Sequence, residues 1–156
     1  MLIRLLAVGT RMPSWVTAGV EDYARRFGPQ IKFEVQEIAL GQRSAGKDAV
    51  RAVEEEGRRM LSALKERSFV VALEVKGKTF TTEQLAHWLG GRLQSGQDLT
   101  LLIGGPDGLA AECVQRSDLR WSLSTLTLPH ALVRIIVAEQ LYRAHSLLNG
   151  HPYHRP

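Results

Sequence analysis

Residues 99–108 read LTLLIGGPDG, and this stretch decides the fold. Its first half is apolar except for Thr100, which is close to the pattern of a strand covered by helices on both faces of a parallel sheet. Glycine-rich sequence follows directly, so the backbone can turn sharply and approach a ligand closely. Open α/β sheets bind their ligands at the carboxyl ends of such strands. The stretch predicts a central strand over residues 99–103, followed by a loop that faces a ligand.

A plain tight turn between a strand and a helix is the alternative interpretation of this loop. The loop has neither the Gly-Lys-Ser/Thr ending of a Walker A motif nor the spaced glycines of a dinucleotide-binding fingerprint. A phosphate cradle is therefore not indicated, and the loop alone leaves its ligand open.

Strand-like and helix-like patterns alternate outward from this stretch. Residues 31–36 alternate between apolar and polar, which predicts a strand at or near an edge of the sheet. Thr81 and Gln84 form a capping-box signature at the start of a helix. The alternation predicts an α/β domain with a mostly parallel sheet flanked by helices. The other expected elements are strands over residues 2–8 and 69–73, helices over residues 13–27, 50–64, 81–93 and 131–148, and a polar loop over residues 41–46.

Length and composition narrow the class of protein. The chain has 156 residues, of which 44% are hydrophobic and 23% charged, as in a single globular domain. We therefore expect one domain over residues 1–156. No apolar run reaches the ~20 residues of a membrane span, and the first run is too short for a signal peptide. Cys113 is the one cysteine, which excludes disulfides and cysteine-based zinc sites. We expect a soluble, cytoplasmic protein with neither membrane nor metal as a partner.

Two later segments hold unusual side chains. Residues 121–130 read WSLSTLTLPH, which by itself is typical of an edge strand that leads into a helix at Pro129. Residues 149–156 read NGHPYHRP, and disordered tails are common at such a position. His151 and His154 lie three residues apart but lack the cysteine or carboxylate neighbours that a metal site needs.

The charge distribution favours a polyanionic partner. The net charge is +4, a mild excess that proves little by itself. From residue 131 to residue 156, however, Glu139 is the only acidic residue, against three arginines and three histidines. This end of the chain therefore provides a basic surface for a polyanionic partner.

Taken together and in this order, these segments closely resemble the RlmH family. The resemblance covers essentially the whole chain. It implies a single-domain SPOUT fold with a carboxyl-terminal trefoil knot, and a homodimer. The implied activity is methyl transfer from S-adenosyl-L-methionine to N3 of a pseudouridine in 23S ribosomal RNA, on assembled ribosomes. The matching segments are residues 7–10, 23–27, 102–108, 121–130, 141–144 and 151–155.

The resemblance also implies a set of site residues. N3 of a uracil ring carries a proton at neutral pH, so a general base, or a cation that stabilises the anion, would help. His154 suits the base, Arg143 or Arg155 would hold a negative ring oxygen or a phosphate, and Tyr153 would stack on the target base. A dimer would bring one protomer's tail beside its partner's cofactor loops. The implied cofactor-binding residues are Leu73, Gly104, Gly105, Leu123, Ser124, Thr125, Leu126, Thr127 and Leu128.

Several alternatives stay open at this point. His130 is a further candidate for the chemistry, but it is also interpreted as a residue that satisfies backbone groups at a helix start. The identity of the base is not decided by the sequence. A SPOUT enzyme that modifies another RNA, such as transfer RNA, would share these features. A non-catalytic ribosome-binding factor on the same fold is the third possibility.

Overall fold

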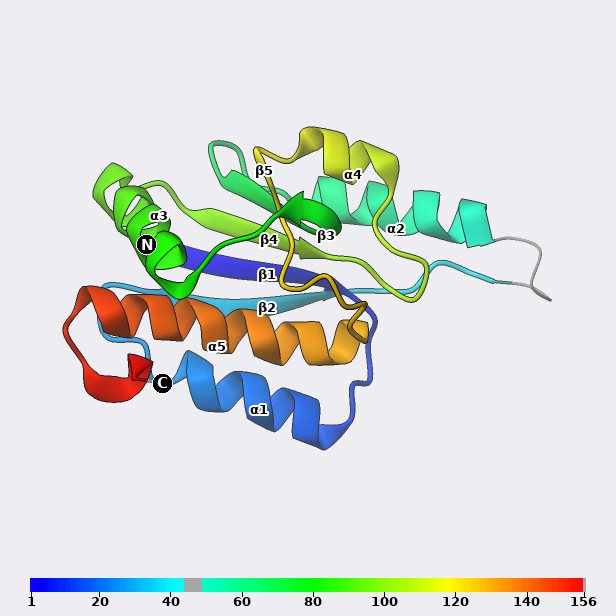
Figure 1. The fold of residues 1–156 in the computed structure, drawn as a ribbon. Coiled ribbons are helices and arrows are strands. Elements are labelled where there is room, and N and C mark those ends of the chain that lie inside the picture. The colour runs from blue at the N-terminus through cyan, green and yellow to red at the C-terminus, as the bar shows by residue number, and fades with distance from the viewer. Residues whose placement is uncertain (44–48, 156) are drawn as a thin grey trace.

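The computed structural model describes residues 1–43 and 49–155. Its centre is a five-stranded sheet in the order β2-β1-β4-β3-β5, and every pair of neighbouring strands is parallel (Figure 1). All five carboxyl ends therefore meet at one edge of the sheet. The strands are β1 Leu2–Val8, β2 Lys32–Ile38, β3 Phe69–Lys78, β4 Leu99–Ile103 and β5 Leu119–Trp121.

Helices cover both faces of the sheet and form two apolar cores. On one face, α1, α3 and α5 pack over the larger core, and on the other α2 and α4 pack over the smaller one (Figure 1). The long helix α5 is central to the first layer, because it contacts both α1 and α3. The helices are α1 Ser14–Ala24, α2 Ala49–Ser62, α3 Thr82–Ser95, α4 Ala111–Arg116 and α5 His130–Leu148, followed by the 3₁₀ turn η1 Pro152–His154.

Several predicted elements are confirmed with their physical causes. β4 has the predicted bounds, is buried at every position and occupies the middle of the sheet. β2 lies at an edge, as its alternating pattern predicts. The α3 capping box is present: the Thr81 side chain accepts from the Gln84 amide, and the Gln84 side chain accepts from the Thr81 amide.

Other expectations need correction. An edge strand over the segment that starts at residue 121 is wrong, because β5 ends at Trp121 and residues 122–129 are irregular. The six-residue α4 was not expected, since one and a half turns are too short to show a helical period. Residues 44–46 of the expected polar loop lie outside the described residues.

The smaller core explains the glycine inside α2. A Cβ atom on Gly57 would lie 2.5 Å from the Cβ of Ala110, so glycine is what lets α2 and the start of α4 touch. Cys113 of α4 lies in the same core, fully buried, and its pKa is raised to about 11 by burial. Within the described residues, no helix is both long and apolar enough to cross a membrane.

Candidate functional site

A cavity of about 530 Å³ opens at the carboxyl edge of the sheet. Its walls are the glycine loop (residues 104–108) after β4, the hydroxyl-rich segment (residues 122–129) after β5, part of β3 and the first turn of α5. The lining is mostly apolar, and this position is where parallel α/β sheets bind their ligands.

The glycine loop is shaped by close backbone contacts. A Cβ atom on Gly104 would lie 2.5 Å from the carbonyl carbon of Gly108, and one on Gly105 would lie 2.8 Å from Cγ1 of Val8. Gly108 has φ +82°, and its amide donates to the carbonyl of Gly105 at 3.1 Å. Side chains are therefore excluded at Gly104 and Gly105, and both residues line the cavity with their backbone.

The serines of the hydroxyl-rich segment shape the segment itself. Ser122 Oγ donates to the carbonyl of Ser124 at 3.0 Å, and Ser124 Oγ accepts from the amide of Leu126 at 3.0 Å. The hydroxyl groups thus replace the hydrogen bonds of a regular strand. This local bonding explains why a sequence with strand-like alternation adopts an irregular conformation and presents leucines to the cavity.

The structure brings most of the predicted cofactor residues together. Thr125 is the exception, because it does not line the cavity. Sequence reasoning missed other lining residues, among them Val75 and Val133, which carry no motif and reach the cavity only through their position in β3 and α5. The predicted residues that do line it are Leu73, Gly104, Gly105, Leu123, Ser124, Leu126, Thr127 and Leu128.

His130 also lines the cavity, at the first position of α5. Burial and the nearby Arg134 guanidinium lower the pKa of His130, so its ring is neutral at physiological pH. Arg134 is itself buried: it pairs with Glu37 at 2.7 Å and donates to the carbonyl of Gly9 at 2.8 Å. This arginine therefore fastens α5 to the ends of β1 and β2.

The predicted catalytic residues lie on the second half of α5 and on the tail that follows it, and Glu139, at the middle of the helix, contacts two of them. Tyr153 donates its hydroxyl to Glu139 Oε1 at 3.0 Å, and Arg143 Nε donates to the same oxygen at 2.9 Å. The ring of Tyr153 packs on that of Tyr142, with 4.8 Å between centroids. The hydrogen bond to Glu139 raises the pKa of Arg143, and burial raises that of Tyr153. Glu139, Tyr142, Arg143 and Tyr153 are called the tail cluster below.

The geometry of the tail defines the tautomer of His154. Nδ1 of His154 lies 2.5 Å from the carbonyl oxygen of His151, and a carbonyl can only accept, so Nδ1 carries the hydrogen. In the neutral ring, Nε2 is then the free acceptor. Arg155 is exposed beside it. The tail thus carries a base nitrogen and an exposed guanidinium on adjacent residues.

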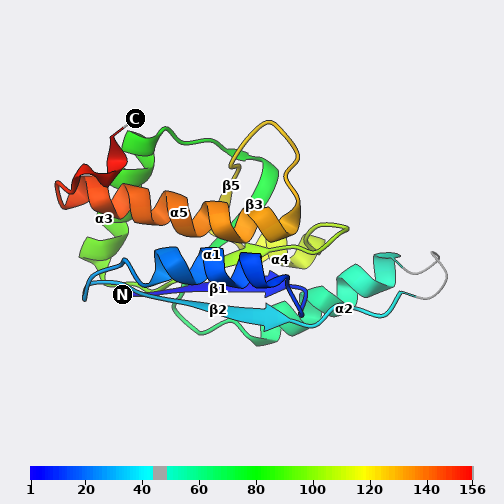
Figure 2. The same cartoon turned by 90° about the horizontal axis from the view of Figure 1, so that it is seen from below.

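Within one chain, the residues of the tail do not line the cavity. α5 has 19 residues and is therefore about 28 Å long. Its first turn lines the cavity, and the tail follows its last turn (Figure 2). The tail folds back on the ends of α1 and α5, where Tyr153 packs beside Tyr23 with 6.4 Å between ring centroids. The predicted cofactor and catalytic residues are thus two separate groups in the monomer.

The structure refines the predicted basic surface. Arg134 and Arg143 form ion pairs with carboxylates, and His145 is buried. His151 and Arg155, in contrast, are exposed on the tail. Positive charge at this end therefore comes from the tail and not from the helix. Within residues 1–43 and 49–155, no group of three or more His, Cys, Asp or Glu side chains is placed to hold a metal ion.

Comparisons with known proteins agree along the whole chain. Residues 1–154 match the model of a family described as "Predicted SPOUT methyltransferase". A ribosomal RNA large subunit methyltransferase H from Alkalilimnicola ehrlichii is 57% identical over 155 residues, which is 99% of each chain. The protein of the same name from Chromohalobacter salexigens is 52% identical over 159 residues, which covers 99% of this chain and 100% of that one.

Solved structures share the fold at low identity. A probable methylase family protein from Haemophilus influenzae Rd KW20 has a TM-score of 0.54 at 12% identity, over 99% of this chain and 70% of that one. TrmJ from Z. mobilis ZM4 has a TM-score of 0.54 at 16% identity, over 93% of this chain and 69% of that one. At such identities the likeness concerns the fold alone.

Proposed function

The chain belongs to the SPOUT methyltransferase family, and from this premise we propose that it methylates N3 of a pseudouridine in 23S ribosomal RNA with S-adenosyl-L-methionine as donor. The observation that carries the proposal is the identity of 52% and 57%, over nearly the full chain, with two ribosomal RNA large subunit methyltransferases H. We expect the enzyme to act in the cytoplasm, on assembled ribosomes.

The residues of the cavity fit such a donor. The space of about 530 Å³ suits an adenosyl and a methionyl group, and the leucines of residues 122–129 offer apolar walls to the adenine ring. Gly104 and Gly105 line the cavity without side chains, so their backbone amides and carbonyls can bind polar atoms of the donor. When bound, the donor supplies an already activated methyl group, so the protein needs to position the acceptor and deprotonate it.

The tail supplies groups suited to the acceptor nitrogen. Nε2 of His154 is the free acceptor of a neutral imidazole, and we assign it the proton of N3. Arg155 would stabilise the negative charge that develops on the ring oxygens as this proton leaves. Arg143 and Tyr153 are held by Glu139, and we assign them contacts with an RNA phosphate and with the face of the target base.

The separation of these two groups supports a homodimer. Because no predicted catalytic residue lines the cavity of the same chain, we propose that a complete site needs the tail of a second copy. The starts of α1 and α5 offer a surface for that copy beside the cavity, where Trp15 is 54% exposed and Leu132 is 37% exposed. Apolar side chains at neighbouring helix starts are what a partner subunit would cover.

The activity is tested by mapping the methylated nucleotide. Ribosomes, isolated large subunits and free 23S RNA are each incubated with the enzyme and labelled donor. We expect N3-methylpseudouridine at one position, with whole ribosomes as the best substrate. A label in transfer RNA, or robust labelling of free 23S RNA, would contradict the proposal. Absence of donor binding in calorimetry would favour the non-catalytic ribosome-binding factor instead.

The shared site is tested by mixing two inactive variants. His154→Ala removes the base of the tail, and Gly104→Ala opens the turn of the glycine loop and weakens donor binding. The assay is run at a donor concentration too low for Gly104→Ala alone to be active. In random mixed dimers about a quarter of all sites combine an intact tail with an intact cavity, so about a quarter of wild-type activity should return. If the site lay within one chain, mixing would restore no activity.

A further inference from the structure

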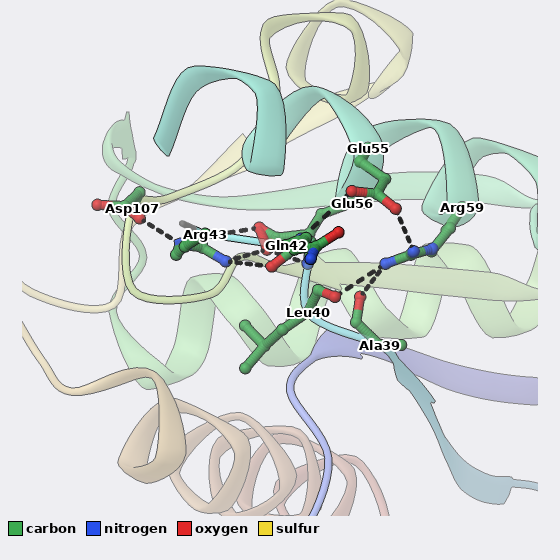
Figure 3. A network of polar contacts seen from close by, with 9 residues as sticks. Ala39, Leu40, Gln42, Arg43, Glu55, Glu56, Arg59 and Asp107 are labelled. Carbon is green, nitrogen blue, oxygen red and sulfur yellow. Dashed lines mark hydrogen bonds and ion pairs between the residues drawn. The ribbon is translucent and has the colours of Figure 1, made fainter. Parts of the chain in front are cut away.

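We propose that Arg43 and Glu56 are positioning residues, which hold the glycine loop in the shape that binds the methyl donor. The proposal rests on the proposed function of the cavity. Neither residue lines the cavity. They act on it through Asp107, the residue of the glycine loop whose carboxylate turns toward Arg43 (Figure 3).

Glu56 is the buried centre of the arrangement. It lies on α2 with 2% of its surface exposed. Its carboxylate accepts from the amide of Gly41 at 3.0 Å and from two nitrogens of Arg43, at 2.8 Å and 3.3 Å (Figure 3). A buried carboxylate is costly unless it is paired and hydrogen-bonded, so these contacts fix the guanidinium in one place.

Arg43 carries the link from α2 to the glycine loop. Its Nε donates to Oδ2 of Asp107 at 3.0 Å, while the other end of the guanidinium is held by Glu56. Pro106 and Gly108, on either side of Asp107, both line the cavity. A change in the position of the Asp107 side chain therefore shifts the backbone of Pro106 and Gly108, which faces the donor.

Packing on the same side adds a second contact. A Cβ atom on Gly105 would lie 3.6 Å from Cδ2 of Leu40, so the segment before Arg43 lies directly against the glycine loop. A Cβ atom on Gly41 would lie 2.3 Å from the carbonyl oxygen of Ala52. Residues 40–43 therefore pack between α2 and the glycine loop.

The neighbouring ion pair shows that fastening this segment to α2 does not require Arg43. Arg59 pairs with Glu55 and donates to the carbonyls of Ala39 and Leu40, at 2.9 Å and 3.0 Å. These contacts end at the segment and do not reach the glycine loop (Figure 3). Among the described residues, the salt bridge to Asp107 comes from Arg43.

The experiment compares donor binding by Arg43→Gln and Asp107→Asn in the full-length protein. By calorimetry, we expect each variant to bind S-adenosyl-L-methionine about tenfold more weakly, and the double variant to be no weaker than either single one. At saturating donor, kcat and the KM for ribosomes should stay near wild type. Arg43→Lys, which can reach one carboxylate but not bridge two, should fall between. Wild-type donor affinity in Arg43→Gln or Asp107→Asn would overturn the proposal, and so would additive effects.

Arg59→Gln is the matched control, because it loosens residues 39–40 from α2 and leaves the Arg43 bridge intact. We expect less than a twofold change in donor affinity. An equal loss in this control would assign the effect to general loosening and would overturn the proposal.

Hydrogen exchange of the amides in residues 104–108 separates this proposal from the proposed function. Arg43→Gln should exchange these amides faster than wild type, while Arg59→Gln should not. If the wild type binds no donor but the amides still respond to Arg43, the function is wrong and the positioning role stands. If the amides do not respond, the positioning role fails.

Discussion

The two ends of helix α5 are built from different chemistry. At its first turn, the cavity is formed by backbone and apolar side chains, and His130 is neutral there. Along its second half, the tail cluster combines a carboxylate, a guanidinium and two tyrosine rings, followed by an exposed arginine. The first turn is suited to holding a cofactor, and the second half with the tail is suited to acting on RNA. The comparison teaches that binding and chemistry can be altered independently, because no residue of the tail cluster lines the cavity.

Loss of the imidazole of His154 gives the largest expected effect. His154→Ala removes the free Nε2, so kcat should fall by roughly 10²- to 10⁴-fold, the usual contribution of a general base. Donor affinity should be unchanged, because the cavity is at the other end of the helix. Single-turnover rates and calorimetry measure the two quantities. A kcat within threefold of wild type would show that His154 is not the general base.

A methyl group in the glycine loop should weaken donor binding and leave the chemical step unchanged, which is the opposite of the effect of His154→Ala. Gly104→Ala places a Cβ atom 2.5 Å from the Gly108 backbone, so the turn must open and donor affinity should fall roughly tenfold to a hundredfold. Gly91→Ala is the control, since a Cβ atom there meets nothing within 4 Å. That control should bind the donor normally. Similar affinities in both variants would mean that the loop does not contact the donor.

Neutralising Glu139 should have a smaller effect. Glu139→Gln weakens the contacts that hold Arg143 and Tyr153, and kcat should fall about tenfold with unchanged donor affinity. Tyr153→Phe removes only one of these contacts and should lose less. A loss of donor affinity in Glu139→Gln would show that the two ends are not independent.

Histidine titration should give the smallest effect, on stability. Burial lowers the pKa of His145, which is 5% exposed, below 6.5. The unfolded chain then binds more protons than the folded one as the pH falls below about 6.5, so stability declines toward the lowered folded pKa. His145→Gln should reduce this decline, as measured by denaturant unfolding from pH 7.5 to 5. An unchanged pH dependence would contradict the assignment.

Sequence reasoning found what depends on local pattern. The apolar run of β4 and the Thr81 cap are contained in a few adjacent residues, and both are confirmed. The conformation of residues 122–129 was not predictable from alternation, because serine side chains replace the strand ladder there. The residues of the cofactor site came from a family resemblance and not from periodicity, as did the trefoil knot, which stays a prediction.

Long-range pairing was beyond the sequence. From the sequence, Arg134 is expected to belong to a basic surface. In the structure it is buried against Glu37, which lies 97 residues away in the chain. Arg43 and Glu56 carried no motif, since their contact depends on how residues 39–43 lie along α2 and on a loop 64 residues away from Arg43. Such pairs follow from tertiary packing, which a single sequence does not display.

The buried thiol of Cys113 makes the protein well suited to site-specific labelling. The thiolate is the reactive form, and a pKa of about 11 in a fully buried position keeps Cys113 protonated and out of reach of maleimides near pH 7. A cysteine introduced at Arg155 would then be the one reactive group in the native chain. A fluorophore there, paired with a ligand-borne acceptor in the cavity, would report how close the tail comes to the cavity, within one chain or between two copies.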